Sequence, residues 1–202
     1  MMIMVRDRLN ASVRTIPEWP LYIVGVFPAV WLLWRGVTGD LGVDPVKVME
    51  HQLGLWALQF LLASLCITPL LRLGRINLIK FRRPLGLLGA LYVLFHFLVW
   101  LLLDLQLRWA EIGADLTKRP YIIVGFVSML ILIPLAATSW QGAMRRLGSK
   151  TWCRLHRLAY VAVILGAVHL VMQEKVWTFQ AIAYLTITLM LVATRLIWLR
   201  RL

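Results

Sequence analysis

Residues 84–103 of the chain are PLGLLGALYVLFHFLVWLLL, a run that holds one histidine, His96, and no Asp, Glu, Lys or Arg. A helix needs roughly 20 predominantly apolar residues to cross a hydrocarbon core about 30 Å thick. The stretch is therefore predicted to span a membrane as a helix. An imidazole inside a membrane is costly and usually functional, so His96 is a candidate site residue.

Further apolar runs of similar length lie on both sides of this one. The chain has 61% hydrophobic residues, ten Trp and a mean hydropathy of +0.79, which is more than a soluble chain of 202 residues carries. We place spans near residues 19–35, 51–71, 84–103, 120–140, 153–172 and 177–198. The predicted fold is all-α, a polytopic membrane helix bundle of about six transmembrane helices.

Lysine and arginine are distributed unequally between the two sets of connecting segments. With the N-terminus inside, the cytoplasmic segments hold sixteen of the 22 Lys and Arg residues, and the other side holds six of them together with seven of the nine acids. Because short loops rich in Lys and Arg stay in the cytoplasm, both termini are predicted to be cytoplasmic. The net charge of +13 then sets orientation and attracts anionic membrane lipid, and it does not indicate nucleic-acid binding.

The segments outside the spans are too short to enclose a core of their own. We therefore divide the chain into a cytoplasmic N-terminal tail (1–18), one transmembrane domain (19–199) and a cytoplasmic C-terminus (200–202). The tail carries Arg6, Arg8 and Arg14, and no small-residue cleavage site follows at once. We expect the first span to be retained rather than removed as a signal peptide.

The composition of the spans excludes several classes of function. Spans two to five have no Asp, Glu, Lys or Arg between their end turns, so the carboxylate chain of a proton pump or ion-coupled transporter is missing. Two cysteines, Cys66 and Cys153, are too few for an iron–sulfur cluster or a structural zinc site built from this chain alone. Tryptophans near the span ends, Trp100 among them, are expected to form aromatic belts at headgroup level.

His96 and His169 form the first candidate pair. His96 lies on the outer half of the third span, and His169 lies at a similar depth near the outer end of the fifth. Neutral imidazole is a common metal ligand and holds haem iron axially. We expect the two side chains to clamp one haem; the alternative is that they form interhelical hydrogen bonds to Ser, Thr or backbone carbonyls.

His156 and His51 have more than one interpretation. His156 precedes His169 by 13 residues, roughly 20 Å along a helix at about 1.5 Å per residue, so it lies near the inner face. It is either the ligand of a second, inner haem or an interfacial residue, and the inner end of the third span offers Arg82 and Arg83 in place of a partner histidine. His51, at the outer end of the second span, is a haem ligand, a propionate or quinone contact, or an interfacial residue.

The loop between the second and third spans is strongly basic, with five cations and no acid: Arg72, Arg75, Lys80, Arg82 and Arg83. Its simplest interpretation is a positive-inside anchor. The guanidinium forks of Arg82 and Arg83 also match carboxylates and phosphates, so this pair could hold haem propionates, a flavin phosphate or an anionic quinone headgroup. The second interpretation does not exclude the first.

Motifs distributed over residues 20–172 occur in a characteristic order and spacing. They are Leu41–Lys47 through His51 and Gly54, Ile67–Leu70, Arg82–Gly86 followed by His96, Thr117–Tyr121, Thr138–Ser139, and Leu147–Gly148 through Trp152, Leu155, His156 and His169. Together they resemble the MsrQ (YedZ) family, which belongs to the ferric-reductase-like transmembrane superfamily. By position, His96, His156 and His169 resemble the family's haem-ligand histidines, and Arg82 and Arg83 resemble its inner basic pair, which is associated with a flavin or quinone.

The resemblance implies a b-type cytochrome of the bacterial inner membrane, with one or two haems and FMN as a further cofactor. Members of the family pass electrons from the quinone pool to MsrP, a periplasmic molybdopterin enzyme that reduces methionine sulfoxide in oxidised proteins. We expect the chain to be an electron-transfer subunit of such an oxidoreductase system rather than its catalytic subunit.

The electron donor and two rival functions stay open at this point. The chain ends directly after the sixth span, without the flavin and nicotinamide domain of NADPH oxidases. We therefore expect electrons to come from quinol or from a cytoplasmic flavin reductase. The alternatives are a stand-alone quinol-dependent metalloreductase, which would use the same haems, and a non-redox membrane protein whose histidines only pack.

Overall fold

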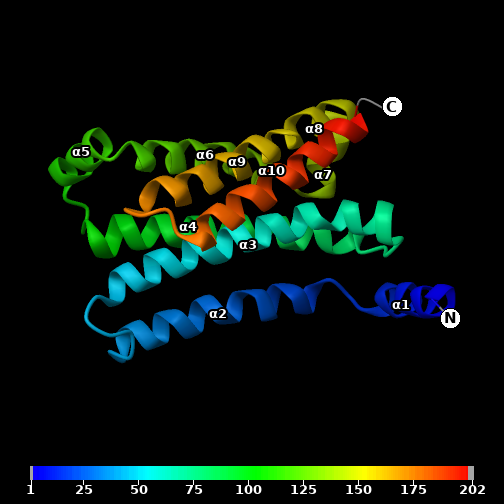
Figure 1. Ribbon diagram of the computed structural model, residues 1–202, viewed down its shortest axis with the longest axis horizontal. Coiled ribbons are helices and arrows are strands. Elements are labelled where there is room, and N and C mark those ends of the chain that lie inside the picture. The colour runs from blue at the N-terminus through cyan, green and yellow to red at the C-terminus, as the bar shows by residue number, and fades with distance from the viewer. Residues whose placement is uncertain (1, 200–202) are drawn as a thin grey trace.

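The computed structural model describes residues 2–199, which form helices joined by short connections (Figure 1). In chain order the elements are α1 (Met2–Thr15), α2 (Trp19–Val37), α3 (Pro45–Gly74), the 3₁₀ turn η1 (Ile79–Phe81), α4 (Arg82–Leu98), the π-helical segment η2 (Val99–Asp104), α5 (Trp109–Lys118), α6 (Pro120–Ala137), α7 (Gln141–Leu147), α8 (Ser149–His156), α9 (Leu158–Gln173) and α10 (Phe179–Leu199). Residues 2–199 contain no β-strand. The predicted all-α class is confirmed.

The predicted membrane spans correspond to helices. Five segments are long and apolar enough to cross a membrane, namely Trp19–Val37, Pro45–Gly74, Ile79–Asp104, Pro120–Ala137 and Ser149–Gln173. A shorter apolar helix, Phe179–Arg195, lies within the sixth predicted span. The polytopic bundle predicted from the apolar runs is therefore confirmed.

The helix α3 begins earlier than the apolar run that predicts the second span. The Asp44 side chain accepts a hydrogen bond from the backbone N–H of Lys47 at 3.1 Å, and Pro45 occupies the first turn. A capping carboxylate followed by proline is a strong helix start. The added turns extend α3 beyond its apolar part and carry Lys47 and Glu50.

Three segments outside the predicted spans are also helical. The N-terminal tail contains α1, the loop after the third span contains α5, and the connection after the fourth span contains α7. In α5, Trp109, Ile112 and Leu116 follow helical spacing and form an apolar stripe beside charged positions. The fifth predicted span is divided at Arg157 into α8 and α9.

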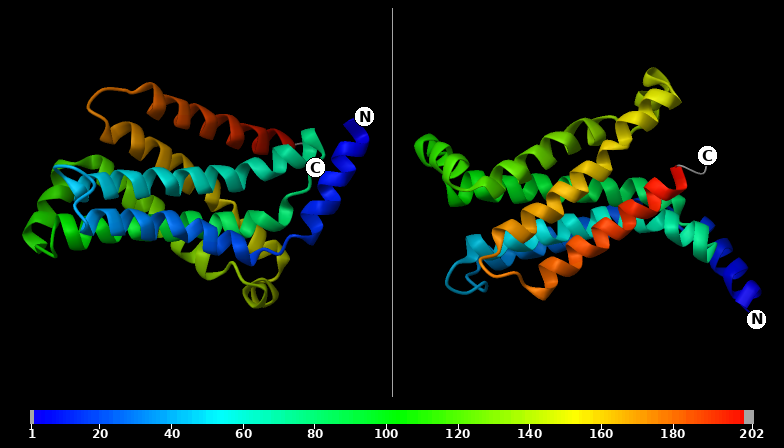
Figure 2. Two further views of the ribbon diagram at one scale, coloured as in Figure 1. Left: turned by 90° about the horizontal axis from the view of Figure 1, so that it is seen from below. Right: turned by 45° about the horizontal axis from the view of Figure 1, so that its top comes forward.

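The helices pack mainly in two pairs, one of neighbouring long helices and one whose members are separated by two short helices. The pair α3 and α4 and the pair α6 and α9 make the most extensive contacts, and α10 packs along α9 (Figure 2). In Figure 1, α2 lies below α3 and α4, and α6, α9 and α10 lie above them. The Tyr92 hydroxyl ties α4 to α2, since it donates to the carbonyl of Gly25 at 2.6 Å and accepts from the N–H of Ala29 at 3.2 Å.

The core is divided into two apolar clusters that follow these layers. One joins α3 to α6, α9 and α10 through buried residues that include Leu62, Leu132 and Val163. The other joins α2, α3 and α4 through Leu32, Leu53 and other buried side chains. The helix pair α3 and α4 contributes to both clusters, so it holds the two outer layers in place.

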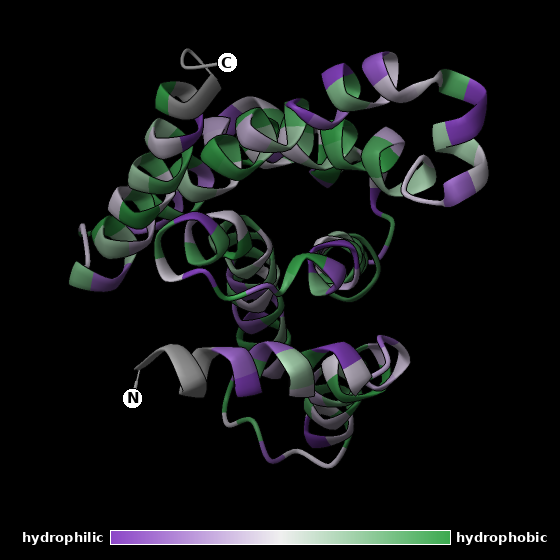
Figure 3. Ribbon diagram, turned by 90° about the vertical axis from the view of Figure 1, so that its right-hand side faces the viewer, coloured by the Kyte–Doolittle hydropathy of each residue, from purple (hydrophilic) through white to green (hydrophobic). Residues whose placement is uncertain are grey.

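One end of the bundle gathers the strongly basic segments, and we call it the basic end. The N-terminal helix α1 lies against the loop after α3, because the Asn10 side chain donates to the carbonyl of Arg75 at 3.1 Å and accepts from the N–H of Asn77 at 2.9 Å. In Figure 3, which looks onto this end, hydrophilic residues gather in the short helices while the long helices are largely hydrophobic. The opposite end carries α5, and we call it the cavity end.

Candidate functional site

His96 on α4 and His169 on α9 face each other across the bundle. Their ring centroids are 6.1 Å apart and their planes are inclined by 77°. The two helices are each held by a different partner, since α4 packs on α3 and α9 packs on α6. The structure therefore brings together the two histidines that the sequence places at the same depth.

A backbone carbonyl orients each of these imidazoles. The Nδ1 atom of His96 lies 2.8 Å from the carbonyl oxygen of Glu50, and Nδ1 of His169 lies 2.7 Å from that of Tyr121. A carbonyl accepts but never donates, so these contacts place the proton on Nδ1. The lone pair of each Nε2 is then available for a metal, the arrangement that outer partners of ligand histidines commonly impose.

A glycine lies against each ring, one helical turn beyond the carbonyl. A Cβ at Gly54 on α3 would lie 3.1 Å from Nδ1 of His96, and a Cβ at Gly125 on α6 would lie 2.8 Å from Nδ1 of His169. Both helix pairs thus use the same local arrangement, in which a carbonyl and a glycine four residues later hold one imidazole. The repeated arrangement indicates a site built around two equivalent ligands.

The space beside these histidines fits an iron porphyrin. A cavity of about 710 Å³ is lined by both imidazoles, by apolar side chains such as Leu58 and Val93, and by Gly166. Its volume lies within the range of small-molecule and cofactor sites, about 300–1,000 Å³. Two bonds of about 2 Å from the imidazole nitrogens to one metal ion suit rings whose centroids are about 6 Å apart. The two imidazoles could hold the iron of such a group.

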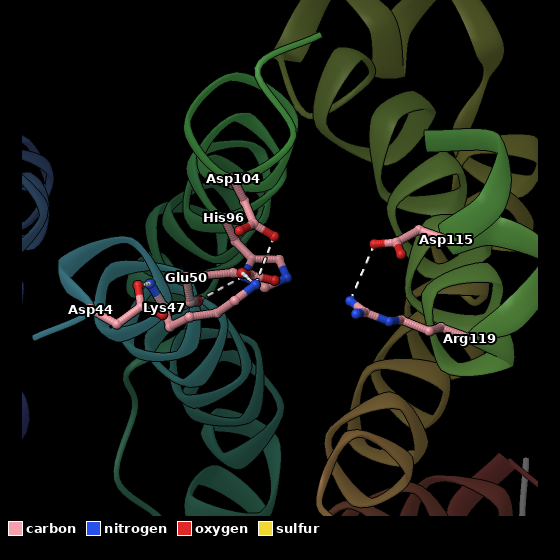
Figure 4. A network of polar contacts seen from close by, with 7 residues as sticks. All are labelled: Asp44, Lys47, Glu50, His96, Asp104, Asp115 and Arg119. Atoms are coloured by element: carbon pink, nitrogen blue, oxygen red, sulfur yellow. Dashed lines mark hydrogen bonds and ion pairs between the residues drawn. The ribbon is translucent and has the colours of Figure 1, made fainter. Parts of the chain in front are cut away.

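Paired charges line the mouth of this cavity at the cavity end (Figure 4). The ammonium of Lys47 lies 2.6 Å from a carboxylate oxygen of Asp104 and 3.5 Å from one of Glu50. Across the mouth, Arg119 pairs with Asp115 at 3.2 Å. Asp104, Glu50 and Asp115 at this mouth are thus each paired with a neighbouring cation.

His51 also lines the cavity, although its side chain is exposed at the mouth. The paired charges Lys47, Glu50 and Arg119 line the same opening. This position suits contact with a polar edge of a ligand more than axial ligation, because the two facing imidazoles lie deeper.

His156 lies at the basic end, away from the 710 Å³ cavity and its lining. Its Nδ1 is 3.1 Å from the carbonyl oxygen of Trp152, and the two rings stack with centroids 3.8 Å apart. Its Nε2 atom is buried, and the backbone of Leu135 lies near the ring. The guanidinium of Arg82 lies within electrostatic range of this imidazole.

Arg82 and Arg83 open α4 at the same end. Arg82 is half-buried, and its carbonyl accepts a hydrogen bond from the Ser64 hydroxyl at 2.9 Å, whereas Arg83 is exposed. Arg195, a cation of the sixth predicted span, is buried to 6% exposure, with Nη2 donating to the carbonyl of Leu65 at 2.7 Å. Arg82 therefore lies near both His156 and Arg195, whereas Arg83 lies near Tyr22 of α2.

The roles of Gly125 and of the carbonyls of Glu50 and Tyr121 are not apparent from the sequence. Gly54 belongs to a sequence motif, but its contact with His96 is not apparent from it either. Both pairs share a glycine four residues after the residue whose carbonyl contacts the imidazole, and this feature is visible only once the helix pairing is known.

Comparison with known proteins finds one matching family and several similar proteins. Residues 52–167 match the family described as the ferric reductase like transmembrane component. A protein-methionine-sulfoxide reductase heme-binding subunit MsrQ from Agrobacterium fabrum is 45% identical over 179 residues, which cover 89% of this chain and 83% of the relative. Proteins of the same name from Brucella ovis and Brucella canis are each 44% identical over 180 residues, 89% of this chain and 80% of the relative. No solved structure matches the chain.

Proposed function

Since the chain belongs to the MsrQ family of heme-binding subunits, within the ferric reductase like transmembrane proteins, we propose that it is the haem-binding membrane subunit of a methionine sulfoxide reductase system. The observation that carries this proposal is the pair of facing imidazoles, His96 and His169, beside a cavity of cofactor size. The names of the relatives supply the system in which such a subunit acts.

His96 and His169 are the proposed axial ligands of a b-type haem. The carbonyls of Glu50 and Tyr121 fix the tautomer and direction of the two rings, which makes each Nε2 a better electron donor to a metal. The chain has no Cys-x-x-Cys-His motif for covalent attachment, so the haem is held by ligation and packing. The bound haem supplies a one-electron redox centre at this position.

A second cofactor site is proposed at the basic end, around His156, Arg82 and Arg83. His156 and the nearby guanidinium of Arg82 would hold either a second haem or the phosphate of FMN, because imidazole is a metal ligand and guanidinium binds carboxylates and phosphates. His51, by contrast, is proposed to contact a propionate or a quinone at the mouth of the first cavity.

We propose that electrons enter the protein from quinol or a flavin reductase and leave it at the cavity end. The protein takes electrons from quinol or from a cytoplasmic flavin reductase, and it delivers them at the cavity end to a periplasmic, MsrP-like molybdopterin reductase that repairs oxidised proteins. Both termini are proposed to be cytoplasmic, in a bacterial inner membrane, because the basic segments gather at one end of the bundle. The proposed limits are 1–18 for the cytoplasmic tail, 19–199 for the transmembrane domain and 200–202 for the C-terminus.

The test is electron delivery by the purified full-length chain in lipid nanodiscs. The haem content is measured by pyridine haemochrome, the haem is reduced with quinol or with a flavin reductase, and its reoxidation is followed after addition of an MsrP-type reductase with a methionine sulfoxide substrate. The proposal expects b-type haem and reoxidation that requires both the reductase and the sulfoxide. Equal reoxidation by ferric citrate without the partner would favour the metalloreductase alternative, and a protein without haem would refute the proposal.

A further inference from the structure

The connection between η2 and α5 exposes two large apolar side chains at the cavity end, and we call residues 105–109 the α5 turn. Trp109 is 74% exposed and Leu107 is 45% exposed. Leu102 and Leu103, just before the turn, are exposed as well, and they belong to the membrane-spanning segment formed by α4 and η2. The exposed apolar surface of this span therefore continues along the chain into the α5 turn.

The backbone of the α5 turn is held by hydrogen bonds in a conformation that leucine rarely adopts. Gln106 and Leu107 both have positive φ, 48° and 58°. The N–H of Leu107 donates to the carbonyl of Leu101 at 3.1 Å, and the N–H of Arg108 donates to that of Leu105 at 2.9 Å. Left-handed residues in turns exposed to water are mostly Gly, Asn or Asp. An exposed leucine in this conformation suits an apolar surrounding better than water.

The depth of the α5 turn matches the headgroup layer of a membrane. The span Ile79–Asp104 has 26 residues. At about 1.5 Å per residue it is about 39 Å long, whereas the hydrocarbon core is about 30 Å thick and the bilayer with its headgroups about 40–45 Å. A span of this length that is centred in the core ends in the headgroup layer. Tryptophan is enriched at this level, because its ring is apolar and its N–H is polar.

The charges of α5 lie on the face opposite Trp109. Glu111 and Asp115 are turned from Trp109 by roughly 160° and 120° around the helix, at about 100° per residue. Asp115 pairs with Arg119 at 3.2 Å beside the cavity mouth (Figure 4), and Glu111 pairs with Arg108 at 2.7 Å. Both acids of α5 are thus compensated within the protein. In Figure 1, α5 lies beyond the ends of α4 and α6 and is set at an angle to both, as a helix at a membrane surface would be.

We propose that the α5 turn and the start of α5 lie in the headgroup layer of the membrane at the cavity end, with Leu107 and Trp109 as lipid anchors. The partner of this surface is the lipid bilayer, and the charged face of α5 is turned to the water beside the cavity mouth. The anchor holds α5 at the membrane surface, so that the mouth opens at the boundary between membrane and water. This anchoring needs no cofactor in the cavity, so it is independent of the proposed haem site.

The test is a depth measurement on the full-length chain in lipid nanodiscs, with Cys66 and Cys153 replaced by Ser. One cysteine is introduced by Leu107→Cys, Trp109→Cys or Glu111→Cys, and it carries a nitroxide spin label. The relaxation of the label is measured with oxygen, which concentrates in lipid, and with a nickel chelate, which stays in water. Labels that replace Leu107 and Trp109 should be more accessible to oxygen than to the chelate.

Glu111→Cys is the matched control, because it lies two residues from Trp109 on the opposite face of α5. Its exposed ion pair with Arg108 contributes little to stability, so the variant should fold as the others do. The label at this position should show the reverse ratio and be more accessible to the chelate than to oxygen.

Two results would overturn the proposal. Greater accessibility to the chelate at Leu107 and Trp109 would place the α5 turn in water, and protection from both reagents would show that protein covers it. A second measurement avoids the introduced cysteines, since it follows the quenching of Trp fluorescence by lipids that are brominated near the headgroup. Wild type should lose a larger fraction of its fluorescence than Trp109→Phe at the same bromolipid content, and equal losses would also overturn the proposal.

Discussion

Gly125→Ala is expected to disturb His169 without touching its ligating atom. The added Cβ would lie 2.8 Å from Nδ1 and 2.9 Å from Cε1 of His169, and ordinary contact begins at 3.4 Å. The ring must therefore move by about 0.6 Å, the difference between 2.8 Å and 3.4 Å. This movement lengthens the 2.7 Å contact between Nδ1 and the carbonyl of Tyr121.

The expected magnitude combines three effects. A weakened hydrogen bond costs about 1 kcal/mol, overpacking costs about 1–3 kcal/mol, and the helix gains about 0.5–1 kcal/mol from replacing glycine. The net loss of about 1–3.5 kcal/mol corresponds to roughly fivefold to three-hundredfold weaker haem binding. Gly54→Ala should weaken haem binding less, because its Cβ would lie 3.1 Å from Nδ1 of His96, farther than the 2.8 Å at Gly125.

The assay is haem affinity and dissociation rate in the purified variants, with the low-spin ferric signal as a check on ligation. Gly113→Ala is the matched control, since a Cβ at this position on α5 meets nothing within 4 Å. It should leave haem binding unchanged. If Gly125→Ala binds haem as wild type does, or if Gly54→Ala is the more damaging change, the proposed support of the two rings is wrong.

Three further variants test the basic end and the acids of the cavity end, where the partner reductase is proposed to dock. His156→Ala should lower haem or FMN content and leave the outer centre spectrally intact; unaltered content of both cofactors would return His156 to an interfacial role. Replacing Arg82 and Arg83 by Lys should slow haem reduction by quinol or flavoprotein, because charge is kept and bidentate geometry is lost; rates equal to those of wild type and of an Arg75→Lys control would leave only membrane anchoring. Neutralising the outer acids should change the rate of partner reduction and its salt dependence at constant haem content, whereas Asp40→Asn should not; indifference of the rate would place docking elsewhere. The outer acids meant here are Asp104, Glu111 and Asp115, which pair with Lys47, Arg108 and Arg119, so their neutralisation also releases three cations.

The helices could be predicted from the sequence because each depends mainly on its own apolar run. The length of residues 84–103 alone places a span there, since a helix in lipid must satisfy its backbone internally. Boundaries were less predictable where polar residues continue the helix, as at Asp44 and Pro45, or where a surface helix such as α5 pairs an apolar stripe with charges.

The pairing of His96 with His169 could be anticipated from equal depth, because depth follows from position along a helix. The rest of the site depends on how helices cross, and a single chain sequence does not contain that information directly. Gly125 gains its role only because α6 packs on α9, and Trp100 differs from other aromatic residues near span ends only because η2 turns it into the cavity lining. The pairing of Asp104 with Lys47 likewise joins residues 57 positions apart.

The central claim is that His96 and His169 are the two axial ligands of one b-type haem. The most direct measurement is electron paramagnetic resonance of the ferric wild-type protein, His96→Ala and His169→Ala, each at known haem content. Wild type should give a low-spin signal typical of two imidazole ligands, and each variant should lose that signal for the outer haem. Retention of the full low-spin signal in both variants, at unchanged haem content, would contradict the claim.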